Sequence, residues 1–107
     1  HVKACPLLVP LVEEGWLRHQ VTMDVLERYL RPLLARRIDT LVLGCTHYPL
    51  LKTAIRQVAG PSLRLVDSAE SCARVVRDEL AAMQLLNASS RKGRIEMFVT
   101  DEPGRFK

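Results

Sequence analysis

A cysteine, a threonine and a histidine follow one another at the end of a short apolar run. The run spans 40–43 and stops at Gly44, and Cys45, Thr46 and His47 come next. A thiol abstracts a proton or attacks a substrate only as the thiolate, and a free cysteine has a pKa of about 8.5. A nearby imidazole and the start of a helix both favour the anion. These residue types at this spacing therefore suit proton transfer or nucleophilic chemistry by Cys45.

The same residues have an interpretation without chemistry. Cysteine is among the residues most often buried, so Cys45 could be a packed small side chain and His47 a capping one. However, five residue types that suit a reactive strand-to-helix turn occur together here: glycine, cysteine, threonine, histidine and proline. Gly44 would ease the turn, Thr46 adds a hydroxyl, and Pro49 suits the first turn of a helix. This concentration favours the functional interpretation.

A strand and a helix are expected to position this turn. The run 40–43 predicts a short buried strand, and apolar residues recur at helical spacing after Pro49 until the stop signal Gly60-Pro61. Open α/β sheets bind their ligands at the carboxyl ends of their strands. The turn would lie at that edge of the sheet.

Upstream of the turn, the pattern predicts two helices. A short or distorted one contains Pro10 and ends near Gly15. A longer one is expected to begin with Thr22 as its cap and to kink or break at Pro32. Two carboxylates, Glu13 and Glu14, end the short helix against its dipole, so they either lie in solvent or one of them faces a site.

Downstream, the pattern predicts a strand, a helix and another strand. A short strand over 63–66 leads to a helix capped by Asp67 or Ser68. Cys72 lies on the apolar stripe of this helix, which predicts a core position. After a polar loop at 87–93, residues 95–99 alternate as in a strand, and 101–104 predict a turn. Strands alternating with helices predict an α/β fold with a largely parallel sheet, present here as part of a larger fold.

Composition narrows the function classes. The 107 residues carry a net charge of +4, but the basic residues are scattered among acidic ones and only 5% of the chain is aromatic, which argues against nucleic-acid binding. No apolar run is long enough to suggest a membrane span. Three cysteines without a Cys-x-x-Cys pair argue against a disulfide framework or a zinc site and fit a reducing cytoplasm.

The segment 44–51 (GCTHYPLL) resembles the second cysteine motif of glutamate racemases. The blocks at 4–15 (ACPLLVPLVEEG), 66–70 (VDSAE) and 98–101 (FVTD) resemble other blocks of that family. The cysteine block is the most specific, because aspartate racemases of the same superfamily usually lack its His-Tyr-Pro sequel.

The resemblance implies an aspartate/glutamate racemase-like fold of two similar α/β domains. Residues 1–66 would come from the second domain, and 67–107 would return to complete a first domain that is otherwise absent. The family's first cysteine lies in a Cys-Asn-Thr motif, which this sequence lacks, as it lacks an Asp-Ser-Gly-Gly-type opening motif. The resemblance therefore implies that the isolated chain is inactive and that its partners are glutamate and the missing N-terminal domain; a homodimer is left open.

The resemblance also implies the reaction and the roles of four residues. Glutamate racemases interconvert L- and D-glutamate for peptidoglycan synthesis without pyridoxal phosphate, a metal or another cofactor. Two cysteines flank the α-carbon, one as base and the other as acid. Cys45 matches the second of them, His47 its helper, Thr46 a residue that binds the substrate α-carboxylate, and Glu13 an acidic helper of catalysis.

Two rival interpretations stand beside this one. The chain could be a non-catalytic α/β binding module in which Cys45 is merely packed. It could also be an aspartate racemase-like thiol enzyme of different substrate specificity. Thiol reactivity distinguishes the first rival from the racemase, and substrate profiling distinguishes the second.

Overall fold

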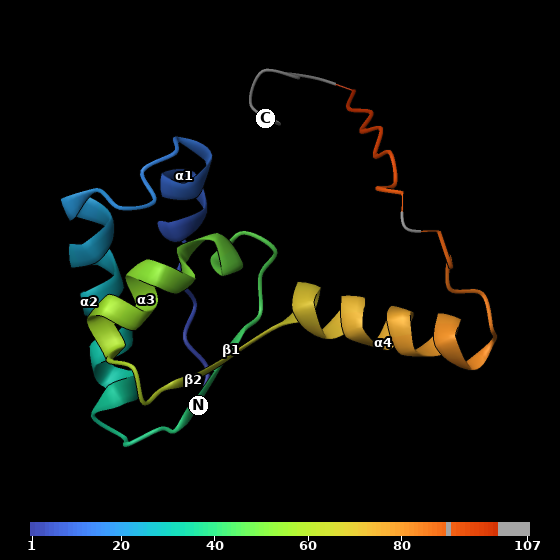
Figure 1. Ribbon diagram of the computed structural model, residues 1–107. Coiled ribbons are helices and arrows are strands. Elements are labelled where there is room, and N and C mark those ends of the chain that lie inside the picture. The colour runs from blue at the N-terminus through green and yellow to red at the C-terminus, as the bar shows by residue number, and fades with distance from the viewer. Residues whose placement is uncertain (90, 101–107) are drawn as a thin grey trace.

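The computed structural model describes residues 1–89 and 91–100 (Figure 1). Its elements follow in the order α1 (Leu8–Glu13), α2 (Gln20–Leu34), β1 (Thr40–Leu43), η1 (Tyr48–Leu51), α3 (Lys52–Ala59), β2 (Arg64–Asp67) and α4 (Ser68–Ala82), where η1 is a 3-10 turn. The predicted strand at 40–43, the helix after Pro49 and the strand before Asp67 are all present. The α/β class with a parallel sheet is confirmed.

The sheet consists of β1 and β2, which lie parallel in the described part of the chain. Leu41 pairs with Leu65, and Leu43 pairs with Asp67. Because parallel strands need a crossover, η1 and α3 together connect the end of β1 to the start of β2. The turn 44–47 therefore begins the crossover, at the carboxyl end of β1.

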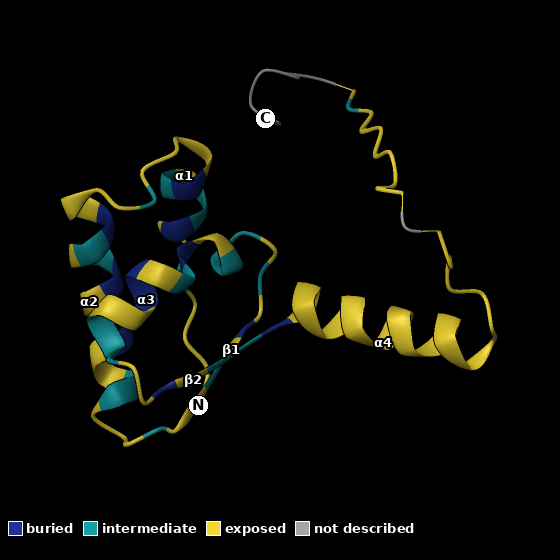
Figure 2. Ribbon diagram, viewed as in Figure 1, coloured by how far each residue is buried: buried dark blue, intermediate teal, exposed yellow. Residues whose placement is uncertain are grey.

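The core lies where α1, α2 and α3 meet next to the sheet (Figure 2). Leu26 of α2 and Leu51 of η1 are completely buried, and Ile55 of α3 is 2% exposed. The other buried apolar side chains of this cluster are Leu8, Val12, Leu30, Leu43 and Ala54. Because Leu43 and Leu51 bracket the turn, both of its ends are anchored in the core.

The prediction for the start of α2 is wrong by a few residues. The cap is His19, whose Nδ1 accepts a hydrogen bond from the Val21 backbone N–H at 3.2 Å. Thr22 is instead completely buried, and its hydroxyl donates to the Trp16 carbonyl. A buried hydroxyl needs a partner, and here the chain before the helix provides it.

The predicted break at Pro32 is also absent. Proline interrupts a helix by removing one hydrogen bond and crowding the preceding turn. Pro32 lies only two residues before the last residue of α2, Leu34, so the helix has little length left to disturb. The short helix around Pro10 does form, as α1, with Pro10 in its first turn, where the lost N–H would have no helical partner.

Helix α4 contradicts the expected core position of Cys72. No described residue of α4 is buried (Figure 2). Cys72 itself is exposed. The apolar side chains of α4 face solvent: Val75 is 60%, Val76 50% and Leu80 37% exposed. The stripe has the spacing of a core-facing helix, but α4 projects away from the other helices, so the described chain covers none of it (Figure 1).

The strand predicted at 95–99 does not form, although these residues are described. Ile95 is 84% and Phe98 88% exposed. Alternation alone does not make a strand, because the backbone also needs a partner for its hydrogen bonds. The turn predicted at 101–104 lies outside the described residues.

An ion cluster holds the junction between α3 and α4. Lys52, at the start of α3, pairs with Asp67 and, at 3.0 Å, with Glu70. Asp67 is only 3% exposed and caps α4, accepting a hydrogen bond from the Glu70 N–H at 2.7 Å. This backbone hydrogen bond and Lys52 lower the pKa of Asp67, and Asp67 in turn raises the pKa of Lys52.

We expect this junction to be acid-sensitive through Asp67. Because its pKa is lowered on folding, the ionised carboxylate stabilises the fold above its ordinary pKa of 3.8, and this contribution is lost as the pH falls through the folded-state value. Asp67→Asn keeps a capping oxygen but removes the charge. We expect it to lower the melting temperature by a few degrees at neutral pH and to weaken the loss of stability below about pH 4.

The measurement is thermal unfolding followed by circular dichroism across this pH range. Asp78→Asn is the matched control, because Asp78 lies on α4, the helix that Asp67 caps, and its side chain is 65% exposed. Equal acid dependence in wild type and Asp67→Asn would contradict the expectation.

Candidate active site

The turn 44–47 presents three polar side chains at the carboxyl end of β1. Gly44 begins it, but its backbone is not left-handed, and a Cβ there would meet no heavy atom within 4 Å. The expectation that a glycine eases a sharp turn here is therefore not supported by this geometry. Pro49 lies at the start of η1, as predicted, where its missing N–H costs no helical hydrogen bond.

His47 lies between a thiol and a carboxylate. Its Nδ1 is 3.9 Å from Cys45 Sγ and 3.4 Å from Thr46 Oγ1. Its Nε2 is 3.5 Å from Glu13 Oε1. The four candidate residues, predicted from two stretches of sequence about thirty residues apart, thus form one connected group.

The order of these groups defines what they can do. A neutral imidazole carries one N–H, and a carboxylate next to Nε2 favours the tautomer with the proton on that nitrogen. The lone pair of Nδ1 then faces Cys45 and can accept the thiol proton. The imidazolium formed would be stabilised by Glu13, which gives the group the order thiol, base, orienting carboxylate.

Of the two adjacent carboxylates, Glu13 and Glu14, only Glu13 contacts His47 in the described residues. Glu13 is the last residue of α1, and its carboxylate reaches His47. Glu14 is exposed and makes no ion pair with the described residues. The sequence left open whether either acid faces a site; the structure brings Glu13 to His47 and leaves Glu14 in solvent.

The contact between Glu13 and His47 is solvent-accessible and therefore weak by itself. The His47 side chain is 34% and the Glu13 side chain 55% exposed. Exposed ion pairs typically contribute about 0–1 kcal/mol. Such a pair can orient the imidazole, but it needs the surrounding structure to keep the two groups in register.

Tyr48 makes a contact that the sequence did not predict. Its hydroxyl donates a hydrogen bond to the Cys5 carbonyl at 3.2 Å. Burial, followed by the neighbouring Cys5 and Cys45 thiols, raises the pKa of Tyr48, so its hydroxyl remains a donor at neutral pH. Nothing in the local pattern indicates this contact, because its partner lies 43 residues upstream.

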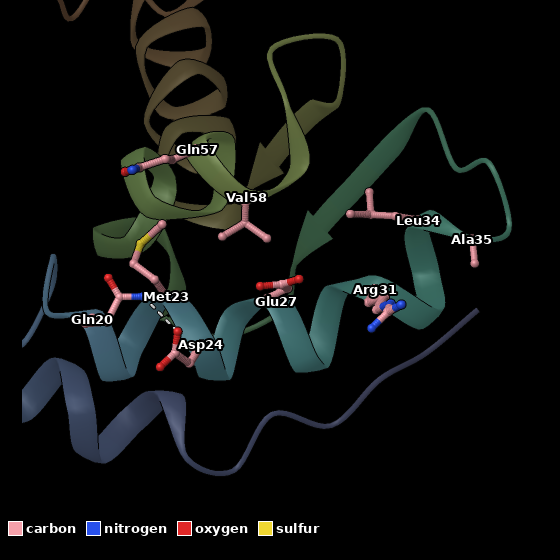
Figure 3. A pocket seen from close by; sticks show the side chains of 9 residues that line it. All are labelled: Gln20, Met23, Asp24, Glu27, Arg31, Leu34, Ala35, Gln57 and Val58. Carbon is pink, nitrogen blue, oxygen red and sulfur yellow. Dashed lines mark hydrogen bonds between the residues drawn. The ribbon is translucent and has the colours of Figure 1, made fainter.

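The largest hollow described lies elsewhere, between α2 and α3 (Figure 3). Its volume is about 770 Å³, and Gln20 and Asp24 at its rim are hydrogen-bonded at 2.8 Å. Its lining residues are Gln20, Met23, Asp24, Glu27, Arg31, Leu34, Ala35, Gln57 and Val58. Because none belongs to the Cys45 group, the hollow is separate from the candidate site.

The described residues contain neither a metal-binding cluster nor a membrane-spanning helix. Within 1–89 and 91–100, no three His, Cys, Asp or Glu side chains are grouped so that they could hold a metal ion. In the same part of the chain, no helix has the length and apolar character needed to cross a membrane.

The geometry predicts unequal reactivity of the cysteines toward iodoacetamide. Burial raises the pKa of Cys5, which reduces its thiolate fraction, so we expect Cys45 to be alkylated at least about tenfold faster near neutral pH. We expect His47→Asn to slow alkylation of Cys45 while leaving that of the exposed Cys72 unchanged. Mass spectrometry of peptides after timed labelling measures all three rates in one sample, so Cys72 serves as the internal control. Unchanged labelling of Cys45 in His47→Asn would contradict a role of the imidazole.

The chain is similar to glutamate racemases along almost its entire length. It is 54% identical over 105 residues to glutamate racemase of Syntrophus aciditrophicus, a match that covers 98% of this chain and 39% of that protein. The chain thus spans about two-fifths of the length of such relatives and matches their C-terminal portion. No protein-family model matches the chain.

Solved structures give the same result. The crystal structure of glutamate racemase from Thermus thermophilus, in complex with β-chloro-D-alanine, aligns with a TM-score of 0.73 at 48% identity and covers 83% of this chain and 34% of that one. The Francisella tularensis enzyme in complex with D-glutamate aligns with a TM-score of 0.68 at 30% identity, covering 82% and 33%. The fold of the chain is therefore that of the corresponding part of glutamate racemases.

Proposed function

We propose that the protein containing this chain is a glutamate racemase, because the chain matches the C-terminal portion of glutamate racemases along 98% of its length. The observation that carries the proposal for this site is the position of His47 between Cys45 and Glu13. That arrangement can make a thiolate on one side of a substrate without a cofactor.

In the proposed mechanism, Cys45 acts on one face of the α-carbon. For L-glutamate, its thiolate removes the α-proton, so an S–H bond forms and the C–H electron pair passes to the carbanion. A second thiol, supplied by the part of the protein outside this chain, donates a proton to the opposite face. For D-glutamate the roles reverse, and Cys45 is the acid.

The neighbouring residues bind and orient. Thr46 would hold the α-carboxylate through its hydroxyl and backbone N–H. His47 would exchange a proton with Cys45, and Glu13 would hold the imidazole in the required tautomer. Glutamate is the proposed substrate, and the D-glutamate formed would supply peptidoglycan synthesis. The reaction would then take place in the cytoplasm, a compartment that free thiols suit.

The proposed domain division explains the exposed face of α4. Residues 1–66 would belong to a second α/β domain, and 67–107 would complete a first domain supplied by the rest of the protein. The support is that β2 is followed directly by a helix whose apolar residues, such as Val75 and Val76, lack partners in the described chain. A large apolar stripe of this kind usually marks a buried interface.

The test is racemisation by the complete protein. L-Glutamate is incubated with it in heavy water, and chirality and α-deuteration are followed together. We expect D-glutamate with deuterium at the α-carbon, with L-aspartate a much poorer substrate. Preferred turnover of aspartate would replace the proposal with an aspartate racemase, and the absence of turnover with either would favour a binding module.

The two adjacent glutamates provide a matched pair of variants. We expect Glu13→Gln to lower kcat by about tenfold, more in the direction in which Cys45 is the base, because the amide no longer stabilises the imidazolium. Glu14→Gln should remain within about twofold of wild type, since Glu14 is exposed and makes no ion pair with described residues. The assay is circular dichroism of glutamate in both directions. A defect in Glu14→Gln alone would show that Glu14, and not Glu13, is the helper carboxylate.

A further inference from the structure

Two neighbouring residues, His47 at the end of the turn 44–47 and Tyr48 at the start of η1, contact opposite ends of the same short helix. His47 reaches Glu13, the last residue of α1, and Tyr48 reaches Cys5, just before its first turn. Helix α1 spans only Leu8–Glu13, so it lies alongside the start of η1 and is attached to it at both ends. The peptide bond between His47 and Tyr48 closes this into a ring of contacts.

The attachment at the start of α1 is the better defined of the two. The Cys5 carbonyl accepts hydrogen bonds from the Tyr48 hydroxyl at 3.2 Å and from the Leu8 N–H at 3.1 Å. Leu8 is the first residue of α1 and is 3% exposed. Tyr48 therefore bonds to the same oxygen that accepts from the first residue of α1, and a shift of α1 along its axis would stretch this bond.

Apolar packing alone would not fix α1 against such a shift. Leu8 and Val12 hold the helix against the core, but the hydrophobic effect is non-directional, so it resists separation more than sliding. At the other end, the contact of Glu13 with His47 is exposed to solvent. Between α1 and η1, the directional contact that remains among the described residues is the hydrogen bond of Tyr48. A second tie runs from α1 to α2 instead, because the Trp16 N–H donates to the Leu11 carbonyl at 2.9 Å and the Trp16 carbonyl accepts from Thr22.

We propose that Tyr48 is a positioning residue of the racemase site: its hydroxyl fixes α1 along the site turn and thereby keeps the Glu13 carboxylate in register with His47. This inference rests on the proposed function for its catalytic consequence. Tyr48 acts through Glu13 and touches no reacting atom. Its effect on the reaction therefore depends on the presence of the Glu13 carboxylate.

The first test compares two tyrosines in the complete protein. Tyr48→Phe removes only the hydroxyl that bonds to Cys5 and leaves the ring packed against the core. Tyr29→Phe is the matched control, because Tyr29 also packs against the core but its hydroxyl makes no hydrogen bond with the described residues. We expect Tyr48→Phe to lower kcat roughly threefold to tenfold in both directions, with little change in KM. Tyr29→Phe should match wild type.

The second test decides whether Tyr48 acts through Glu13. In the Glu13→Gln background there is no carboxylate left to position, so Tyr48→Phe should cause little further loss of kcat. The double variant is therefore expected to have nearly the rate of Glu13→Gln alone. Multiplicative losses in the double variant, or equal losses in both tyrosine variants, would overturn the proposal.

A third measurement does not depend on catalysis. The His47 imidazole resonances of labelled protein report its contact with Glu13. We expect Glu13→Gln to shift these resonances in wild type but hardly at all in the Tyr48→Phe background, with Tyr29→Phe behaving as wild type. An identical shift in all backgrounds would overturn the inference. The His47 shift caused by Glu13→Gln could depend on Tyr48 in a protein that does not racemise glutamate. The proposed function would then fail, while the positioning role of Tyr48 would stand.

Discussion

Cys45→Ala is expected to abolish almost all glutamate racemisation by the complete protein, in both directions. Cys45 carries the transferred proton itself on one face of the substrate, and no other described thiol can replace it, since the other two are Cys5 and Cys72, neither of which joins the His47 group. General acid–base groups typically contribute about 10²–10⁴-fold to the rate, so the loss should be at least of this size. Circular dichroism of D- and L-glutamate over time measures it.

Cys72→Ala is the matched control for this variant. It removes a thiol that lies exposed on α4, and its rate should stay within about twofold of wild type. Near-normal turnover of Cys45→Ala in both directions, in a protein whose melting temperature is unchanged, would disprove the two-thiol mechanism.

The isolated 107-residue chain is expected to form no D-glutamate from L-glutamate. Cys45 can exchange a proton on one face of the α-carbon, but inversion needs an acid on the other face as well. Positioning of both groups around one substrate contributes much of the rate, and the Cys45 group alone offers one side. Chiral chromatography after long incubation in heavy water is the measurement.

The control for this experiment is the complete protein at the same molar concentration as the isolated chain, so that both samples contain equal amounts of Cys45. Its D-glutamate should appear at an enzymatic rate, while the isolated chain should match buffer. Mixing the isolated chain with a separately produced N-terminal segment tests the reason for the inactivity. D-Glutamate formation by the chain alone would show that it contains both proton-transfer groups.

The elements that could be predicted from the sequence are those whose signal and partner lie close together. The strand at 40–43, the helix after Pro49 and the cap at Asp67 each depend on neighbours within a few residues. The grouping of Cys45 with His47 follows from their spacing in the same way. That Glu13 faces a site was expected only through the resemblance, because α1 and η1 meet through tertiary packing.

The parts that failed depend on contacts with distant chain. Thr22 has the chemistry of a cap, but the Trp16 carbonyl provides its partner from outside the helix. Cys72 lies on an apolar stripe that predicts a core, yet α4 has no described surface to pack against. Tyr48 could not be singled out, because its hydroxyl finds the Cys5 carbonyl only after folding.

The pairing of β1 with β2 has a consequence for anyone who handles this chain by itself. In the described residues each strand bonds to the other along one side only, and Val42 in the middle of β1 is 68% exposed. The remaining N–H and C=O groups along the outer sides form templates onto which strands of other molecules can add. Together with the apolar stripe of α4, they make the isolated chain prone to aggregation. The concentration of an inactive sample should therefore be kept low, and its particle size should be measured to show whether the chain is monomeric.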